Sequence, residues 1–215
     1  MKTKNANFVL IGLILASAAA SLMLYPMLPR AMATHWGLTG EPDGFMSRFW
    51  AALFTPALMA AMFILFLILP KVDPLKHNVA LFRQQYNTVV TSIIGFIAAL
   101  HAYVLAWNLG MRFPVTWVVV PLMALLFFVI GSALPKMKQN WFMGIRTPWT
   151  MSSEAVWRKT HEHAGRIFQW LALVMIFGLL IPRQTFPIVI GGILCACAWV
   201  ILYSYLTYKK LQQRA

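Results

Sequence analysis

Two polar segments carry most of the side chains that could do chemistry, because most of the chain is apolar. The first holds His35, Trp36, Glu41 and Asp43. Nearby glycines and the step Pro42-Asp43-Gly44 predict folded turns rather than a helix, so these side chains should lie close together. An imidazole, an indole and two carboxylates on such turns could bind a ligand or a peptide.

Two alternatives stay open for this first segment. Asp43 could hydrogen-bond its own turn while His35 packs on the helix ends, and composition alone favours this structural role. One histidine and two carboxylates could also hold a divalent metal, but their spacing is not diagnostic of a metal site. We therefore expect no metal and no cofactor.

The second polar segment runs from Asn140 to Arg166. Pro148 predicts an extended Thr147, and a serine at 152 or 153 followed by Glu154 predicts the start of a helix. Helical spacing places one set of side chains on a single face of that helix: Trp157, Thr160, His161, Ala164 and Phe168.

Charged residues of this same helix repeat every four positions with alternating sign, which predicts a ladder of ion pairs: Glu154, Arg158, Glu162 and Arg166. The neighbouring His161-Glu162-His163 is a weak metal motif. Side chains two residues apart diverge on a helix, and the i,i+4 pair of a zinc helix is missing.

Long apolar runs must position both segments. Hydrophobic residues make up 60% of the 215 residues and charged residues 11%, a balance unlike that of a soluble domain. The runs are apolar on every face and have about the length of a membrane-spanning helix. They predict an all-α, polytopic membrane protein with six transmembrane helices: Phe8–Tyr25, Phe49–Leu69, Val89–Leu109, Thr116–Leu134, Ile167–Ile181 and Ile188–Tyr208.

The first run could be a cleaved signal peptide, since Ala16-Ser17-Ala18 resembles a cleavage site, but its length favours a retained helix. Basic residues then orient the chain. Of 18 lysines and arginines, only Arg30, Arg48, Arg112 and Arg183 fall outside if the N-terminus is inside. The other basic residues, including Lys2 and Arg214 near the two ends, predict that both termini are cytoplasmic.

The net charge of +13 is spread over several loops, so it indicates membrane lipids rather than direct contact with nucleic acid. Within the runs there is no Asp, Glu, Lys or Arg, which argues against ion-coupled transporters and intramembrane proteases. The strongly polar exceptions are His101, Asn108 near an end, and Gln169. His101 is expected to hydrogen-bond between helices, the alternative being a functional group with an unidentified partner.

The inner segment resembles the signature of the SdpI family of bacterial membrane proteins, through Asn140, Gly144-Ile145-Arg146-Thr147-Pro148-Trp149-Thr150, Ser153, Trp157, Thr160-His161 and Gly165. The outer His35-Trp36, Gly40, Asp43 and Gly44 resemble the small domain of unknown function that commonly precedes it. Gly37 and Arg48 depart from that outer pattern. We expect an N-terminal helix pair at 1–70 and a four-helix SdpI-like domain at 71–215.

The resemblance implies a non-enzymatic protein of the bacterial cytoplasmic membrane that gives immunity to a secreted toxic peptide and, in some relatives, recruits a transcriptional repressor. His35, Trp36, Glu41 and Asp43 are then the candidate outer ligand site. The candidate inner partner site comprises Asn140, Arg146, Thr147, Trp149, Thr150, Trp157, Thr160 and His161. The alternatives are a membrane enzyme or small-solute transporter with its site at one surface, and a structural membrane subunit.

Overall fold

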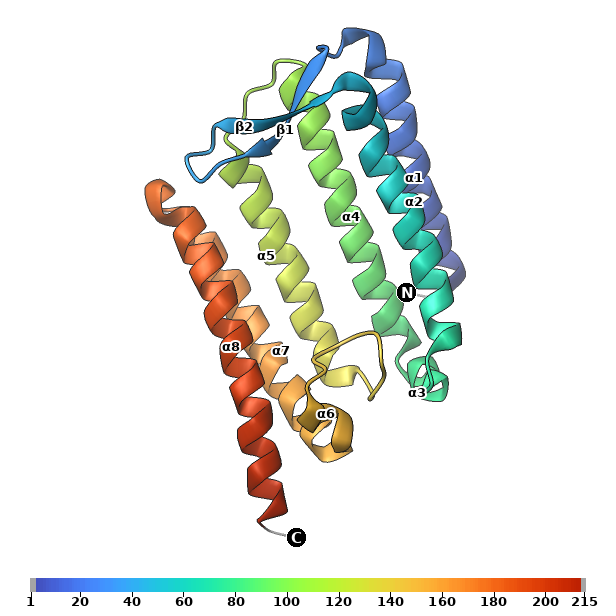
Figure 1. The fold of residues 1–215 in the computed structure, drawn as a ribbon, viewed down its shortest axis with the longest axis vertical. Helices are drawn as coiled ribbons and strands as arrows, with labels where there is room; N and C mark the ends of the chain where they lie inside the picture. The colour runs from blue at the N-terminus through green and yellow to red at the C-terminus, as the bar shows by residue number, and fades with distance from the viewer. Residues whose placement is uncertain (1–2, 214–215) are drawn as a thin grey trace.

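The computed structural model describes residues 3–213 of the chain, in which six long helices run side by side (Figure 1). These are α1 (Thr3–Leu24), α2 (Arg48–Val72), α4 (Arg83–Asn108), α5 (Val115–Ala133), α7 (Glu154–Gly178) and α8 (Thr185–Gln212). Short helices lie between them: η1 (Tyr25–Met27), α3 (Lys76–Leu81), η2 (Leu134–Lys136), α6 (Pro148–Ser152) and η3 (Pro182–Gln184).

Five of the long helices are long and apolar enough to cross a membrane: α1, α2, α4, α5 and α8. The sixth, α7, begins at Glu154 and carries its charged residues before the apolar part. The chain is therefore a multi-pass, predominantly helical membrane protein, as the apolar runs predicted. Six crossings and two cytoplasmic ends stay predictions, and Lys2 and Arg214 lie outside the described residues.

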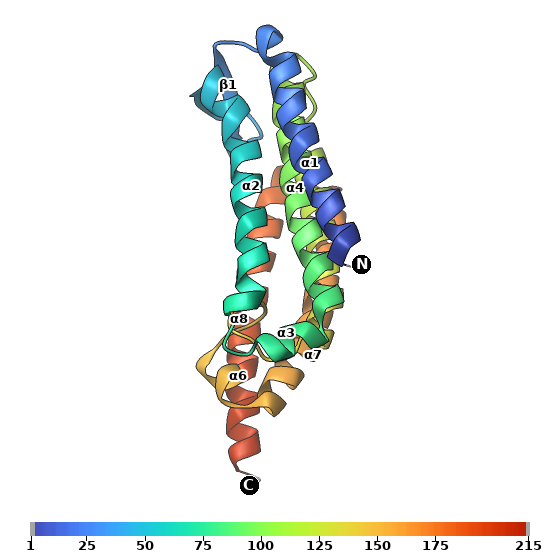
Figure 2. The ribbon, with the colours of Figure 1, turned by 90° about the vertical axis from the view of Figure 1, so that its right-hand side faces the viewer.

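The outer polar segment contains a β-hairpin, where the sequence predicted only turns. Strand β1 (Ala31–Trp36) pairs antiparallel with β2 (Pro42–Ser47), with Ala31 opposite Ser47. The turns expected from glycine lie between the two strands. On either side of these turns the backbone is outside the helices, so its N–H and C=O groups have no helical partners. Pairing the two strands with each other satisfies these groups. Figure 2 shows the hairpin at the end of the bundle opposite to α3 and α6.

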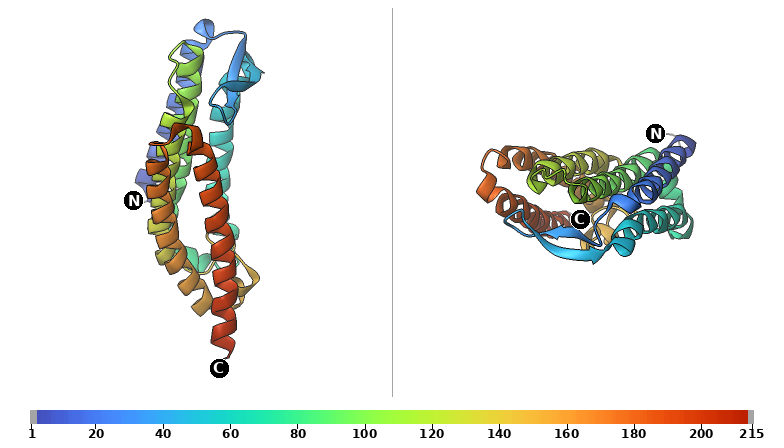
Figure 3. Two further views of the ribbon diagram at one scale, coloured as in Figure 1. Left: turned by 90° about the vertical axis from the view of Figure 1, so that its left-hand side faces the viewer. Right: turned by 90° about the horizontal axis from the view of Figure 1, so that it is seen from above.

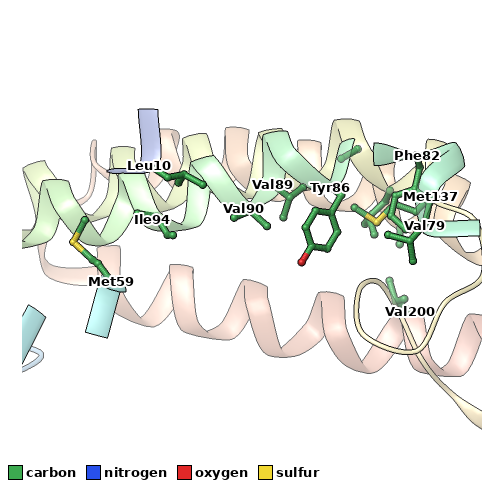
Figure 4. Close-up of a cluster of buried hydrophobic side chains, with 13 residues drawn as sticks. Leu10, Met59, Val79, Phe82, Tyr86, Val89, Val90, Ile94, Met137 and Val200 are labelled. Atoms are coloured by element: carbon green, nitrogen blue, oxygen red, sulfur yellow. The ribbon is translucent and has the colours of Figure 1, made fainter. Parts of the chain in front are cut away.

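The main buried cluster lies toward the α3 end of the bundle (Figure 4). It joins Leu10 of α1, Met59 of α2 and Ile94 of α4, with Met59 and Ile94 fully shielded. Met137, which precedes the inner loop, belongs to the same cluster. The core therefore extends to the inner polar segment and supports it.

Helices α5 and α7 contact each other at one glycine from each helix. A Cβ atom at Gly165 would lie 2.7 Å from the carbonyl oxygen of Gly131, and the reverse substitution meets the same limit. Small residues let the two backbones approach this closely, as is common between membrane helices. Seen from above in Figure 3, the hairpin lies across one end of the bundle, beside α2 and toward α8.

Candidate functional site

The hairpin brings His35 and Asp43 together. The Nδ1 atom of His35 lies 2.5 Å from Oδ1 of Asp43, and both side chains are exposed. Glycines make the room. A Cβ at Gly44, which is paired with His35 across the strands, would lie 2.7 Å from the His35 Cβ. A Cβ at Gly37 would lie 2.7 Å from Oδ2 of Asp43. The pair therefore depends on both glycines.

Trp36 and Glu41 lie differently from this pair. Trp36 packs on α4, with ring centroids 5.1 Å from Tyr103 and 5.6 Å from Trp107. Glu41 is exposed. Among the side chains that the structure describes, the ion pair found is His35 with Asp43, and none is found there for Glu41.

Asn108 fixes the hairpin to α4. Its Oδ1 accepts a hydrogen bond from the Ala33 N–H, and its Nδ2 donates to the Ala33 carbonyl, each at 2.9 Å. The side chain thus mimics a neighbouring strand. The sequence marked Asn108 as a polar residue near a helix end, but nothing in its spacing indicates Ala33 as the partner.

A partly open cavity of about 470 Å³ lies beneath the hairpin. Its walls come from Thr55 and Leu58 of α2, Val104 of α4, Val119 of α5 and Phe186 of α8, with both strands contributing at the rim. Its lining is mostly apolar. His35 and Trp36, two of the expected ligand-binding residues, also line it.

His101 stabilises the helices around this cavity. Ser21 of α1 donates to the carbonyl of Ala52 on α2 at 2.8 Å, and its Oγ lies 2.8 Å from Nε2 of His101 on α4. The expected role of His101 as a hydrogen bonder between helices is confirmed. Through Ser21 these two bonds join three helices directly beside the cavity, which His101 also lines.

Asn140 shapes the inner loop from within. It is 1% exposed, and its Nδ2 donates to the carbonyls of Lys138 and Met143 at 2.9 and 2.8 Å. Its Oδ1 accepts from the N–H groups of Phe142 and Met143 at 3.1 and 2.7 Å. A buried amide that satisfies four backbone groups fixes a loop in one conformation.

Thr147 and Thr150 form a capping box at the start of α6. Thr147 is extended, with φ −106° and ψ 162°, as Pro148 predicted, and its hydroxyl accepts from the Thr150 N–H. The Thr150 hydroxyl donates to the Ile145 carbonyl at 2.8 Å. Thr147 also hydrogen-bonds Ser204 of α8 at 3.0 Å, which ties the motif to the last helix.

His161 holds the loop against α7. Its Nδ1 donates to the Trp157 carbonyl at 2.8 Å, and its Nε2 accepts from the Ile145 N–H at 3.0 Å, so the ring is neutral. Burial lowers the pKa of His161, which precedes the apolar part of α7, to about 4. The ring stacks on Trp157, whose indole N–H donates to the Met137 carbonyl at 2.8 Å. Gly144, at φ +108°, leaves room for both rings.

The inner candidate residues divide by exposure. Six are buried or nearly so: Asn140, Thr147, Thr150, Trp157, Thr160 and His161. Arg146 is exposed and donates to the carbonyl of Trp141, which is itself exposed. Trp149 is half-buried against Tyr205, with ring centroids 5.1 Å apart. The surface that a partner could reach is therefore Arg146, Trp149 and Trp141.

The expected ladder of ion pairs on α7 is wrong for the part of the chain that the structure describes. No ion pair found there joins Glu154, Arg158, Glu162 or Arg166. Exposed pairs at this spacing contribute only about 0.3–0.5 kcal/mol each, so the side chains are free to point into solvent. The helix start was predicted correctly, since the Ser153 hydroxyl accepts from the Val156 N–H.

Asp73 also holds the inner loop, and the sequence reasoning missed it. It is 3% exposed, and its carboxylate accepts from the N–H of Leu75 at 2.7 Å and of Trp141 at 3.0 Å. It therefore joins the connection after α2 to the inner loop. An aspartate followed by Pro74 signals a turn, but its second partner lies far away in the sequence.

The described residues contain no candidate metal site. Within residues 3–213, no group of three or more His, Cys, Asp or Glu side chains could hold an ion.

Comparisons with known proteins match two separate segments of the chain. Residues 136–204 match the model of the SdpI/YfhL protein family, and residues 12–60 match a domain of unknown function, DUF1648. The chain is 23% identical over 206 residues to the immunity protein SdpI of Bacillus subtilis (strain 168), covering 95% of this chain and 97% of the relative. None of the solved structures matches. A segment that matches the SdpI/YfhL family model thus follows one that matches DUF1648, as the two motifs indicated.

Proposed function

We propose that this chain is an SdpI-type immunity protein that protects a bacterium against a secreted toxic peptide. The observation that carries the proposal is the match to an immunity protein over nearly the full length of both chains. Because the match includes both the hairpin segment and the inner loop, it supports a shared function and not only a shared fold.

The geometry supports separate roles for the two ends of the bundle. The hairpin, with His35, Trp36, Glu41 and Asp43, lies at one end, and the inner loop lies at the other (Figure 1). In the bacterial cytoplasmic membrane, the excess of basic residues near the loop puts it in the cytoplasm and the hairpin outside. The hairpin then meets the toxic peptide. We assign it to an N-terminal unit at 1–70 and the loop to a unit at 71–215.

The inner loop would contact a repressor protein in the cytoplasm. Arg146 and Trp149 supply the contact, because an exposed guanidinium beside aromatic rings is a common feature of protein interfaces. The six buried residues of the motif hold the loop in shape, through the hydrogen bonds of Asn140, Thr150 and His161 described above.

Gene deletion tests the proposal. A deletion strain of the source bacterium, grown in spent medium of its parent, should lose viability, and protease treatment of the medium should abolish the killing. A plasmid copy of the chain should restore growth. Equal growth of the deletion strain and the parent in untreated medium would contradict immunity.

A membrane enzyme or small-solute transporter is the second candidate, and one observation favours it. The cavity of about 470 Å³ has the size of small-molecule sites. Lipid product profiles and uptake of radiolabelled solutes, compared between deletion strain and parent, would separate this candidate from immunity. A difference in either, without sensitivity to spent medium, would favour it.

A further inference from the structure

We propose that the cavity beneath the hairpin holds the apolar segment of a cationic peptide, whose basic group is received by the carboxylates of Asp43 and Glu41. The proposal rests on the proposed immunity function and names the site and the chemistry by which the peptide would be recognised.

The cavity is placed to admit a ligand from the side. It is bounded by α2 on one side and by Phe186 of α8 on the other, with α4 and α5 behind. Large apolar side chains in its wall are accessible, since Phe54 is 53% and Leu58 is 38% exposed. The view from above in Figure 3 shows the hairpin lying across the space between α2 and α8.

Apolar surface alone does not select an occupant here. A lipid chain is as apolar as leucine, so an apolar segment gains little free energy by leaving lipid for this cavity. Selection must therefore come from shape and from the polar rim, where His35 lines the cavity and hydrogen-bonds Asp43.

The rim is acidic. The chain has only five acidic residues, and two of them, Glu41 and Asp43, are on the hairpin. Two arginines at this end of the bundle lie over aromatic rings, Arg48 over Tyr25 and Arg112 over Trp107. The hairpin therefore offers two carboxylates to a cation: Glu41, and Asp43 beside His35.

This charge favours a peptide over a phospholipid. A lysine or arginine side chain, or an amino terminus, carries a positive charge without a phosphate. A phospholipid headgroup would bring its phosphate against Glu41 and Asp43, and like charges repel. An apolar segment with a basic group beside it satisfies both the cavity and the rim.

Filling the cavity tests the proposal in cells. Thr55→Trp places an indole in the cavity, whereas Leu53→Trp places the same indole on α2 at a 46% exposed position that does not line the cavity. Each variant is expressed in the deletion strain, and its amount in the membrane is measured. Protection against the cationic peptide fraction of spent medium should fall about tenfold for Thr55→Trp, or ~1.4 kcal/mol, and stay unchanged for Leu53→Trp.

The two failures are distinguishable. A deletion strain that is not sensitive would refute the immunity function itself. A sensitive deletion strain that is rescued equally by wild type and by Thr55→Trp, at equal protein amounts, would refute the cavity alone. If Thr55→Trp is not inserted into the membrane, the double variant Glu41→Gln/Asp43→Asn decides, because both positions are exposed. It should lower protection severalfold, and full protection by it would overturn the proposal.

Photo-crosslinking identifies the occupant. A photoreactive benzoylphenylalanine replaces Phe186 in the cavity, or Ile190 on the same helix as the control, which is 46% exposed and does not line the cavity. The protein, in nanodiscs of phosphatidylethanolamine and phosphatidylglycerol, is irradiated with the cationic peptide fraction. A peptide adduct at position 186 but not at 190 is expected. Phospholipid adducts alone at position 186, or equal peptide adducts at both positions, would refute the proposal.

Discussion

The inner loop should be sensitive to a single methyl group at Gly144. This residue has φ +108°, and a Cβ there would lie 2.5 Å from Nε2 of His161 and 3.3 Å from the indole of Trp157. The alanine of Gly144→Ala therefore has to strain its own backbone and push His161 away from the Ile145 N–H.

The expected cost follows from these two effects. A non-glycine residue in such a backbone region costs about 1–3 kcal/mol, and a buried N–H that loses its acceptor costs about 1–3 kcal/mol. One shift of the loop relieves part of both, so we expect Gly144→Ala to lower the free energy of unfolding by about 2–4 kcal/mol.

Equilibrium unfolding of the purified protein in mixed micelles with rising SDS, followed by tryptophan fluorescence, measures this cost. Gly95→Ala is the matched control, because no heavy atom lies within 4 Å of a Cβ at that position in α4. It should unfold at the same SDS fraction as the wild type. If Gly144→Ala also unfolds there, the packing of Gly144 against His161 does not hold the loop.

Three further predictions concern the two ends of the bundle. The pKa of His161 is about 4 against an ordinary 6.5, so its neutral form stabilises the fold fully above pH 6.5. This contribution is lost as the pH falls toward 4, by roughly 3 kcal/mol, and SDS unfolding at several pH values should show it; a stability independent of pH would contradict the buried neutral ring. Asn108→Leu removes both bonds to Ala33, so protease should cleave the hairpin severalfold faster than in the wild type, and equal cleavage rates would exclude this attachment. Arg146→Ala should weaken capture of a cytoplasmic partner at normal protein amount, whereas Thr150→Val should lower the amount itself, as immunoblots of membranes would show; a loss of protein with Arg146→Ala would make Arg146 structural.

Local patterns predicted much of the fold. The apolar runs, the extended Thr147 before Pro148 and the start of α7 at Ser153 each depend on residues close in sequence. The shared face of Trp157 and His161 followed from helical spacing, but its burial did not. Each of these features is decided by the nearest turn of chain, so a single sequence is enough.

Contacts between distant segments could not be predicted in this way. Asn108 pairs with Ala33, and Asp73 with the Trp141 N–H. Each partner is one backbone group among many, and neither periodicity nor composition distinguishes it. The hairpin was missed for the same reason, since turn residues predict where a chain reverses but not which flanking residues pair across it.

The burial of the inner motif also changes how its residues are interpreted. A conspicuous run such as Gly144 to Thr150 suggests a contact surface, but two of its hydroxyls hydrogen-bond within the protein. That of Thr147 bonds Ser204 of α8, and that of Thr150 bonds the Ile145 carbonyl. Sequence spacing does not separate a side chain that binds a partner from one that shapes the loop. Exposure does, and it leaves Arg146 and Trp149 as the proposed contact.

The account depends most directly on the hairpin and the inner loop facing opposite compartments. Leu38→Cys in the hairpin turn and Trp141→Cys in the loop, at exposed positions, are made one at a time in a chain whose Cys195 and Cys197 are changed to serine. A membrane-impermeant maleimide should label Leu38→Cys in intact cells and Trp141→Cys only after the membrane is opened. Labelling of both in intact cells, or of neither, would contradict the account.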